Sequence, residues 1–126
     1  LLMQTLAGGP VQVLGWRVVP TNPDILPEEA RECLPAIEQL LLRVEPGTDE
    51  VALERWLYNR RLELRQKFRA AGLACYVASL SGRLVNYKGL LTSHHLATFY
   101  GDLADPRFES GLAIFHRRYS TNTYPN

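Results

Sequence analysis

The most regular alternation of apolar and polar positions lies between residues 49 and 71. Large apolar side chains recur there at spacings of four, seven and four residues, at Leu53, Leu57, Leu64 and Phe68. These spacings place the four side chains on one face of a helix, and Trp56 widens that face. Thr48 or Asp49 suits the N-cap, and Gly72 suits the position after the last turn. The pattern therefore predicts an amphipathic helix over residues 49–71.

Shorter apolar runs predict strands on both sides of this helix. Residues 11–19 are rich in β-branched side chains, and a change of phase indicates a bulge near Gly15. Residues 37–44 are too few to separate strand from helix by period, and we favour a strand. Residues 75–80 and 83–87 flank a Ser-Gly turn signal, which predicts a β-hairpin.

The remaining segments alternate turn signals with short elements. A proline-rich loop at 21–27 precedes a predicted short helix at 28–33. Ser93 is a candidate cap for a second helix that carries Leu96, Phe99 and Tyr100 and stops near Gly101. Asp105-Pro106 marks the next loop, and residues 111–119 predict a last strand.

Length and composition describe an ordinary globular chain. Its 126 residues, 46% apolar and 21% charged, fit one domain, and a net charge of +1 gives no overall attraction for nucleic acid or anionic lipid. No apolar run approaches the roughly 20 residues that cross a bilayer, so we expect a soluble protein. The first residue is Leu1 and the chain stops after polar and aromatic residues, which suggests a piece of a longer polypeptide.

The predicted long helix concentrates positive charge. Six of the fourteen basic residues lie within 15 positions, at Arg55, Arg60, Arg61, Arg65, Lys67 and Arg69. Such a cluster raises nucleic-acid binding as a hypothesis. However, Glu50, Glu54 and Glu63 are interleaved with these residues, so a solvated face with local ion pairs is the favoured interpretation.

The cysteines and paired histidines give weak signals for chemistry. Cys33 and Cys75 have no glycine-rich elbow or sequence-adjacent base, so we expect them to be structural, as small buried apolar residues. His94 and His95 point about 100° apart on a helix and have no third ligand at a suitable spacing. We interpret them as surface or helix-capping residues, and no metal site is predicted.

The last predicted strand carries the more specific candidates. In extended geometry one face holds Leu112, Ile114, His116 and Arg118. Arg118 then ends an apolar stripe, and its planar fork suits a two-point contact with a carboxylate. Residues 120–123 are Ser-Thr-Asn-Thr, which could hold a ligand or form a hydrogen-bonded turn, with the turn favoured by residue physics alone.

The same region carries a long family resemblance. Residues 105–110 (Asp-Pro-Arg-Phe-Glu-Ser) and 114–125 (Ile-Phe-His-Arg-Arg-Tyr-Ser-Thr-Asn-Thr-Tyr-Pro) resemble the amidotransferase domain of glutamate synthases. Further similar segments follow the same order, at residues 15–17, 19–20, 53–58, 76–81, 87–90 and 99–103. The resemblance covers most of residues 11–125.

The resemblance implies a fold and a reaction. The fold would be α+β, part of an N-terminal nucleophile hydrolase αββα sandwich with antiparallel sheets, and residues 1–126 would be a partial class II glutamine amidotransferase domain. A cysteine at the mature N-terminus of such a domain attacks glutamine and releases ammonia. In the parent enzyme this ammonia converts 2-oxoglutarate to glutamate.

Departures from the family pattern limit which residues carry over. Leu1 is not cysteine, no cysteine precedes Cys33, and the family's Asn-Gly oxyanion pair would lie beyond Asn126. No catalytic residue is therefore assigned, and the isolated segment is expected to be inactive. The resemblance assigns substrate binding instead, to Arg118 rather than Arg117, together with Ser120, Thr121 and His116. The alternative is a non-catalytic interaction or scaffold module derived from the same fold.

The resemblance also implies cofactors and partners. FMN and an iron-sulfur cluster would belong to other domains of the parent, and none is expected on this segment. The partners would be glutamine, the remaining domains, and ferredoxin or a nicotinamide-dependent subunit as the electron source, without nucleic acid or membrane. The location would be the cytoplasm or the plastid stroma.

Overall fold

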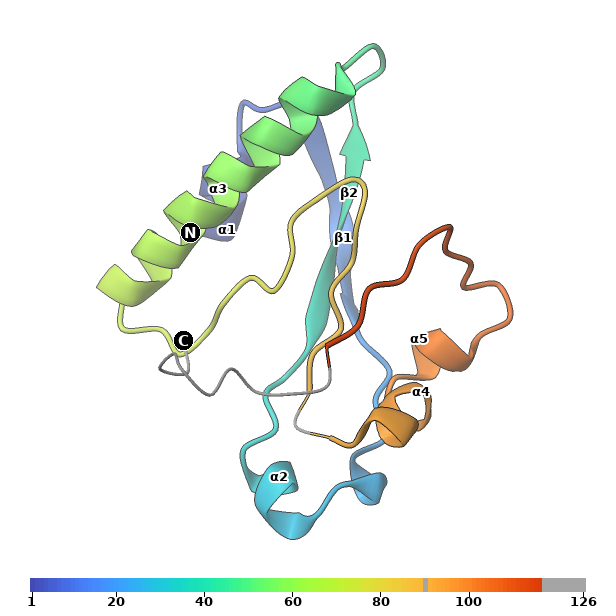
Figure 1. Cartoon of the computed structure of the whole chain (residues 1–126). Helices are drawn as coiled ribbons and strands as arrows, with labels where there is room; N and C mark the ends of the chain where they lie inside the picture. Colours follow the sequence, from blue (N-terminus) through green and yellow to red (C-terminus); the bar gives the residue numbers. More distant parts are fainter. Residues whose placement is uncertain (90, 117–126) are drawn as a thin grey trace. The chain divides into compact units, whose positions relative to one another are not determined.

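The computed structural model describes residues 1–89 and 91–116, and the chain divides into two compact units (Figure 1). Unit 1 comprises Leu1–Arg17 and Glu38–Lys88, and unit 2 comprises Val18–Ile37 and the chain from Gly89 onward. The elements in chain order are α1 (Leu2–Leu6), β1 (Val11–Val18), the 3₁₀ helix η1 (Pro23–Ile25), α2 (Glu28–Glu32), β2 (Glu38–Val44), α3 (Glu50–Ala70), η2 (Ser93–His95), α4 (Leu96–Phe99) and α5 (Gly101–Ala104).

Helix α3 confirms the strongest sequence pattern. Its four buried residues are Leu53, Leu57, Leu64 and Phe68. The Asp49 carboxylate accepts a hydrogen bond from the Ala52 N–H at 2.8 Å, which satisfies one of the free donors of the first turn. At the other end Gly72 has a φ of +64°, and the Leu73 N–H returns to the Phe68 carbonyl at 2.9 Å. Glycine is favoured there because this left-handed conformation strains other residues.

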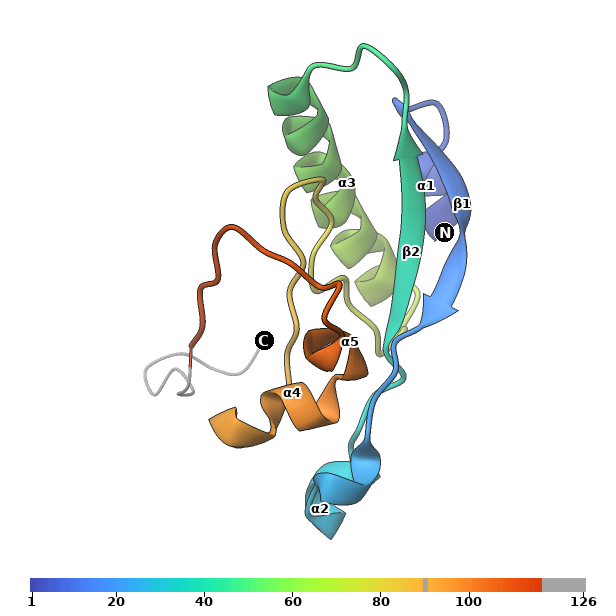
Figure 2. The same ribbon diagram turned by 90° about the vertical axis from the view of Figure 1, so that its right-hand side faces the viewer.

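Strands β1 and β2 form a two-stranded antiparallel ribbon (Figure 2). The Glu45 N–H donates to the Pro10 carbonyl at 3.0 Å, and Arg17 donates two side-chain hydrogen bonds to the Gln39 amide oxygen across the strands. Both predicted strands are thereby confirmed. The predicted bulge is wrong, because the alternation of exposure along β1 continues unbroken through Gly15.

Helix α1, which no sequence pattern predicted, is held against α3. The buried Thr5 hydroxyl donates to the Leu1 carbonyl at 3.0 Å and accepts a hydrogen bond from Lys67 Nζ at 2.9 Å. The turn after α1 approaches the Trp56 ring so closely that a Cβ on Gly9 would lie 1.9 Å from a ring carbon. Any larger residue at that position would therefore force the Trp56 ring to move.

The predicted β-hairpin is wrong, since no strand is present in residues 75–87. The turn at Ser81-Gly82 is present, but side chains take the backbone donors around it. The Ser81 hydroxyl accepts from the N–H groups of Arg83 and Leu84, and the Ser79 hydroxyl accepts from the Asn86 N–H. Such local side-chain bonds compete with a strand ladder, and an isolated two-stranded hairpin is marginally stable.

In unit 2 the residues just after β1 pair with the end of α4. Thr21 and Tyr100 form an antiparallel bridge, and the Asn22 N–H donates to the Phe99 carbonyl at 2.8 Å. The Phe99 and Tyr100 rings are buried and lie edge to face, with centroids 4.7 Å apart. The short helix predicted at residues 28–33 is present as α2, which confirms that prediction.

Three other expectations for unit 2 are corrected. Thr92, rather than Ser93, occupies the N-cap position of η2, because Ser93 is already within the first turn. Gly101 does not end the helical region, since α5 begins there after a break at Tyr100. Residues 111–116 form no strand, because no described segment pairs with their backbone. Residues 117–119 of the predicted strand lie outside the described residues.

The described residues thus form a mixed chain of helices and a small antiparallel sheet. This agrees with the α+β class. The described residues form one two-stranded sheet, so the two stacked sheets of the expected sandwich stay a prediction.

Candidate functional site

The predicted binding residues fall at the end of the described chain. His116 is exposed and follows an irregular segment in which Leu112, Ile114 and Phe115 are also exposed. Arg118, Ser120 and Thr121 lie outside the described residues. Their assignment to substrate binding therefore stays a prediction.

A hydrogen-bonded turn precedes this segment. The Asp105 carboxylate accepts hydrogen bonds from the Arg107 backbone N–H at 2.8 Å and from its guanidinium at 2.9 and 2.6 Å. The side-chain bond to Arg107 is the main cause that lowers the pKa of Asp105 below its ordinary value. The Phe108 N–H closes the turn on the Asp105 carbonyl at 2.9 Å. The Asp-Pro-Arg-Phe segment of the family pattern is thus a turn closed by hydrogen bonds among its own residues.

A second cluster joins two segments that carry the family resemblance, residues 53–58 and 76–81. One oxygen of the Glu54 carboxylate accepts from the Ser81 hydroxyl, and the other accepts from the Gly82 N–H, both at 2.7 Å. Glu54 and Ser81 are half-buried, and a Cβ on Gly82 would lie 3.2 Å from Glu54 Oε1. We call this cluster the Glu54 anchor, because it attaches the loop at 79–86 to α3.

An ion pair one turn earlier on α3 reinforces the anchor. Arg83 Nε lies 2.6 Å from Glu50 Oε1. This hydrogen bond lowers the pKa of Glu50 and raises the pKa of Arg83. The expectation that Glu50 and Glu54 pair along the helix is corrected, since both carboxylates bind the loop. Glu63 does pair along the helix, with Arg60 at 2.8 Å and Lys67 at 2.7 Å.

Sequence reasoning missed the Glu54 anchor, although both of its parts were visible. Glu54 was assigned to the solvated helix face, and Ser81-Gly82 was assigned to a hairpin turn. Nothing in the spacing connects positions 54 and 81, because this contact depends on how the loop returns over α3. The signal that could have found it is that both positions lie in segments that resemble the same family.

Unit 2 joins two further segments of the family pattern. The Gly101 N–H donates to the Pro20 carbonyl at 3.0 Å, which connects residues 19–20 with residues 99–103. A Cβ on Gly101 would lie 3.5 Å from the Pro20 ring, which is ordinary contact. Lack of space around Pro20 therefore does not explain why residue 101 is a glycine.

The cysteines differ from their sequence prediction, since both Cys33 and Cys75 are exposed. The Cys33 thiol donates to the Glu29 carbonyl at 2.9 Å at the end of α2.

His94 and His95 lie in η2 with their rings 4.2 Å apart, and the Thr92 hydroxyl is 3.3 and 3.1 Å from their ring nitrogens. In residues 1–89 and 91–116 no group of three or more His, Cys, Asp or Glu side chains could hold a metal ion.

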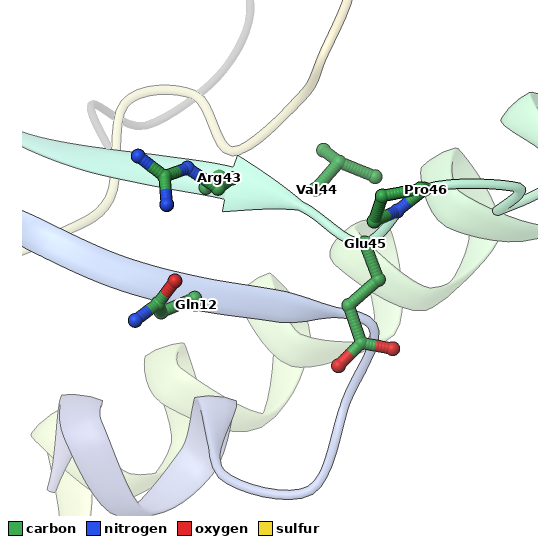
Figure 3. Close-up of a pocket in the computed structure, with 5 residues that line it drawn as sticks. All are labelled: Gln12, Arg43, Val44, Glu45 and Pro46. Carbon is green, nitrogen blue, oxygen red and sulfur yellow. The ribbon is translucent and has the colours of Figure 1, made fainter.

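Unit 1 also has a shallow concavity at the end of β2. Its volume is about 310 Å³, and it is lined by Gln12, Arg43, Val44, Glu45 and Pro46. Figure 3 shows Arg43 and Glu45 directed away from each other, and both side chains are exposed. The lining therefore offers no convergent polar groups of the kind that orient a small ligand.

Comparison with known proteins identifies the family. The family model of class-II glutamine amidotransferases matches residues 2–126. The chain belongs to this family. The chloroplastic ferredoxin-dependent glutamate synthase of Spinacia oleracea is 38% identical over 127 residues, covering 99% of this chain and 8% of the relative.

Two other relatives give similar values. Ferredoxin-dependent glutamate synthase 1 of Arabidopsis thaliana is 42% identical and covers 91% of this chain and 7% of the relative. The NADPH glutamate synthase large chain of Azospirillum brasilense is 42% identical and covers 90% of this chain and 8% of the relative. The chain thus spans about 7–8% of these relatives' length, and the resemblance to the amidotransferase domain of glutamate synthases is confirmed.

Across the described part of the chain, no helix combines the length and apolar character that a membrane span needs.

Proposed function

We propose that this chain is the glutamine-binding portion of the amidotransferase domain of a glutamate synthase. The observation that carries the proposal is the sequence identity of 38–42% to three glutamate synthases over 90–99% of the chain. The domain would be an N-terminal nucleophile hydrolase sandwich, in which the β1–β2 ribbon is one part of an antiparallel sheet and α3 belongs to a helical layer. In the alternative, a scaffold module of the same fold, the binding residues would have no catalytic consequence.

In this proposal the parent enzyme hydrolyses glutamine to glutamate and ammonia. The nucleophile is a cysteine outside this segment, and the ammonia aminates 2-oxoglutarate, which is then reduced by two electrons to glutamate. The electrons come from ferredoxin or from a nicotinamide-dependent subunit. The relatives' printed names, which include ferredoxin and NADPH, support either source.

The residues of this chain do not suit the iron-sulfur cluster of that reduction. An iron-sulfur cluster is commonly held by four cysteine thiolates, whereas the chain has two cysteines, Cys33 and Cys75, which lie in different units. We therefore assign the iron-sulfur cluster to another domain of the parent, and we propose that FMN also belongs to a domain outside this segment. The location would be the cytoplasm or the plastid stroma, which is supported by relatives named from bacteria and chloroplasts.

Arg118 is the residue to which we assign recognition of glutamine. Its planar guanidinium can donate two parallel hydrogen bonds to the α-carboxylate of the substrate. The hydroxyls of Ser120 and Thr121 would lie beside this contact. His116 would share the face of Arg118 if the segment is extended, because alternate residues of a strand point to the same side.

Steady-state kinetics of the full-length enzyme test this assignment. A charge-assisted hydrogen bond contributes about 1.5–3 kcal/mol, so Arg118→Ala should lower kcat/KM for glutamine by roughly tenfold to a hundredfold, mainly through KM. Arg118→Lys should recover part of the loss, because an ammonium lacks the planar two-point contact. Glutamate synthesis from free ammonia, where the enzyme supports it, should be unchanged because ammonia does not need the glutamine site.

Arg117→Ala is the matched control, since it removes the neighbouring guanidinium and leaves the predicted contact. A normal KM for glutamine in Arg118→Ala would refute the assignment. Equal loss of both activities, together with a lower folded yield, would instead show that Arg118 pairs with a protein carboxylate and stabilises the fold.

A further inference from the structure

One exposed face of α3 combines apolar and cationic side chains. We call it the arginine stripe, and its members are Val51, Arg55, Tyr58, Leu62, Arg65 and Arg69. At about 100° per residue, these six positions fall within an arc of about 80°, well apart from the buried face of the helix. The fractional exposures of Val51, Tyr58 and Leu62 are 58%, 57% and 40%. Large apolar side chains therefore form the middle of a face that points to solvent.

The charge on this stripe is of one sign. Glu50 and Glu54 are bonded to the loop at 79–86, and Glu63 lies on another side of the helix. Glu63 pairs with Arg60 and Lys67. Among the residues that the structure describes, the three arginines of the stripe form no ion pair. The earlier interpretation of the basic residues as a solvated face with local ion pairs thus holds for Arg60 and Lys67. It does not explain the arginine stripe.

We infer that the arginine stripe binds a carboxylate-bearing surface elsewhere in the same full-length polypeptide. Three guanidinium groups around an apolar centre complement a surface with Asp or Glu side chains around an apolar side chain. The relatives are about twelve times longer than this chain, so their remaining domains provide ample surface to cover it.

The composition of the stripe disfavours two other occupants. A second copy of α3 packed on the same face would bring arginines against arginines, which is destabilising. Nucleic acid would gain from the arginines but not from burying Val51 and Leu62, because phosphate contacts need no apolar centre. A protein surface uses both parts of the stripe.

Photo-crosslinking in the full-length protein tests the inference. Tyr58 is replaced by p-benzoylphenylalanine, a 1:1 mixture of isotopically light and heavy protein is irradiated, and cross-linked peptides are identified by mass spectrometry. We expect cross-links within one polypeptide, to a peptide outside residues 1–126 that carries Asp or Glu. Light–heavy cross-links, adducts with nucleic acid, cross-links only to residues 1–126 or to peptides without carboxylates, or no cross-link would each overturn the inference.

Charge reversal on the same helix supplies the specificity test. Arg65→Glu should lower the cross-link yield by about fivefold or more, the equivalent of about 1 kcal/mol for an exposed ion pair. The matched control is Arg61→Glu, an exposed position one turn away and off the stripe, which should change the yield by less than about twofold. Equal effects of the two reversals would contradict the inference. Glutamine kinetics are measured in parallel, and the cross-link result does not depend on them.

Discussion

The Glu54 anchor gives a prediction whose size follows from the structure. Glu54→Ala removes the acceptor of two hydrogen bonds, from the Ser81 hydroxyl and the Gly82 N–H, each 2.7 Å long. A shielded hydrogen bond to a charged group contributes about 1.5–3 kcal/mol, but exposed charged contacts contribute about 1 kcal/mol or less. Gly82 is exposed and Glu54 is half-buried, so we assign about 1 kcal/mol to each bond, near the lower of these ranges.

The expected consequence is local opening of the loop at 79–86. A loss of about 2 kcal/mol corresponds to about 30-fold faster amide hydrogen exchange for peptides that cover this loop. Glu54→Gln keeps one acceptor oxygen, so we expect about fivefold faster exchange from the loss of about 1 kcal/mol. Exchange in the full-length protein is followed by mass spectrometry, with peptides from α3 as an internal reference.

The control variant is Glu63→Ala. It also removes a carboxylate from α3, but its partners are Arg60 and Lys67 and it does not touch the loop. Its exchange in residues 79–86 should equal that of the unsubstituted protein. Unchanged exchange in Glu54→Ala, or equal acceleration in both variants, would refute the reasoning that these two bonds hold the loop.

Three further predictions concern the core, the pH response and the isolated segment. Leu64 has no exposed surface, so Leu64→Ala should lower the free energy of unfolding by about 2–5 kcal/mol in denaturant titration, and an unchanged midpoint would contradict this. Because the Arg83 hydrogen bond holds the folded pKa of Glu50 below its ordinary value of 4.5, its stabilisation is present above that value and is lost as the pH falls through the folded pKa. Amide hydrogen exchange at Arg83, corrected for the intrinsic exchange rate at each pH, should therefore accelerate on acidification. In Glu50→Gln the part of this acceleration that is due to protonation of Glu50 should be lost. The 126-residue segment alone should release no ammonia from glutamine and should self-associate through exposed apolar residues such as Trp16. Ammonia release above blank, or a monomer with a cooperative thermal transition, would contradict the respective statement.

Local chemistry explains which parts of the fold could be predicted. Helix α3 was predictable because a 3.6-residue period, an Asp49 cap and Gly72 all act within the helix itself. Strands β1 and β2 were predictable because their apolar runs are bounded by turn residues. The hairpin at 75–87 was not, because the hydroxyls of Ser79 and Ser81 compete for the backbone donors that a ladder would use.

The candidate site divides in the same way. The sequence determined the family, through motifs that run in order along most of the chain. The assignment of Arg118 to glutamine, which we draw from the same motifs, stays a proposal. Tertiary structure alone decided that Glu54 binds the loop at Ser81 and that Glu50 pairs with Arg83. It also decided which arginines of α3 are paired with Glu63 and which are not. The physical reason is that a helical period fixes which side chains share a face, whereas the partner of each carboxylate depends on where a distant segment returns.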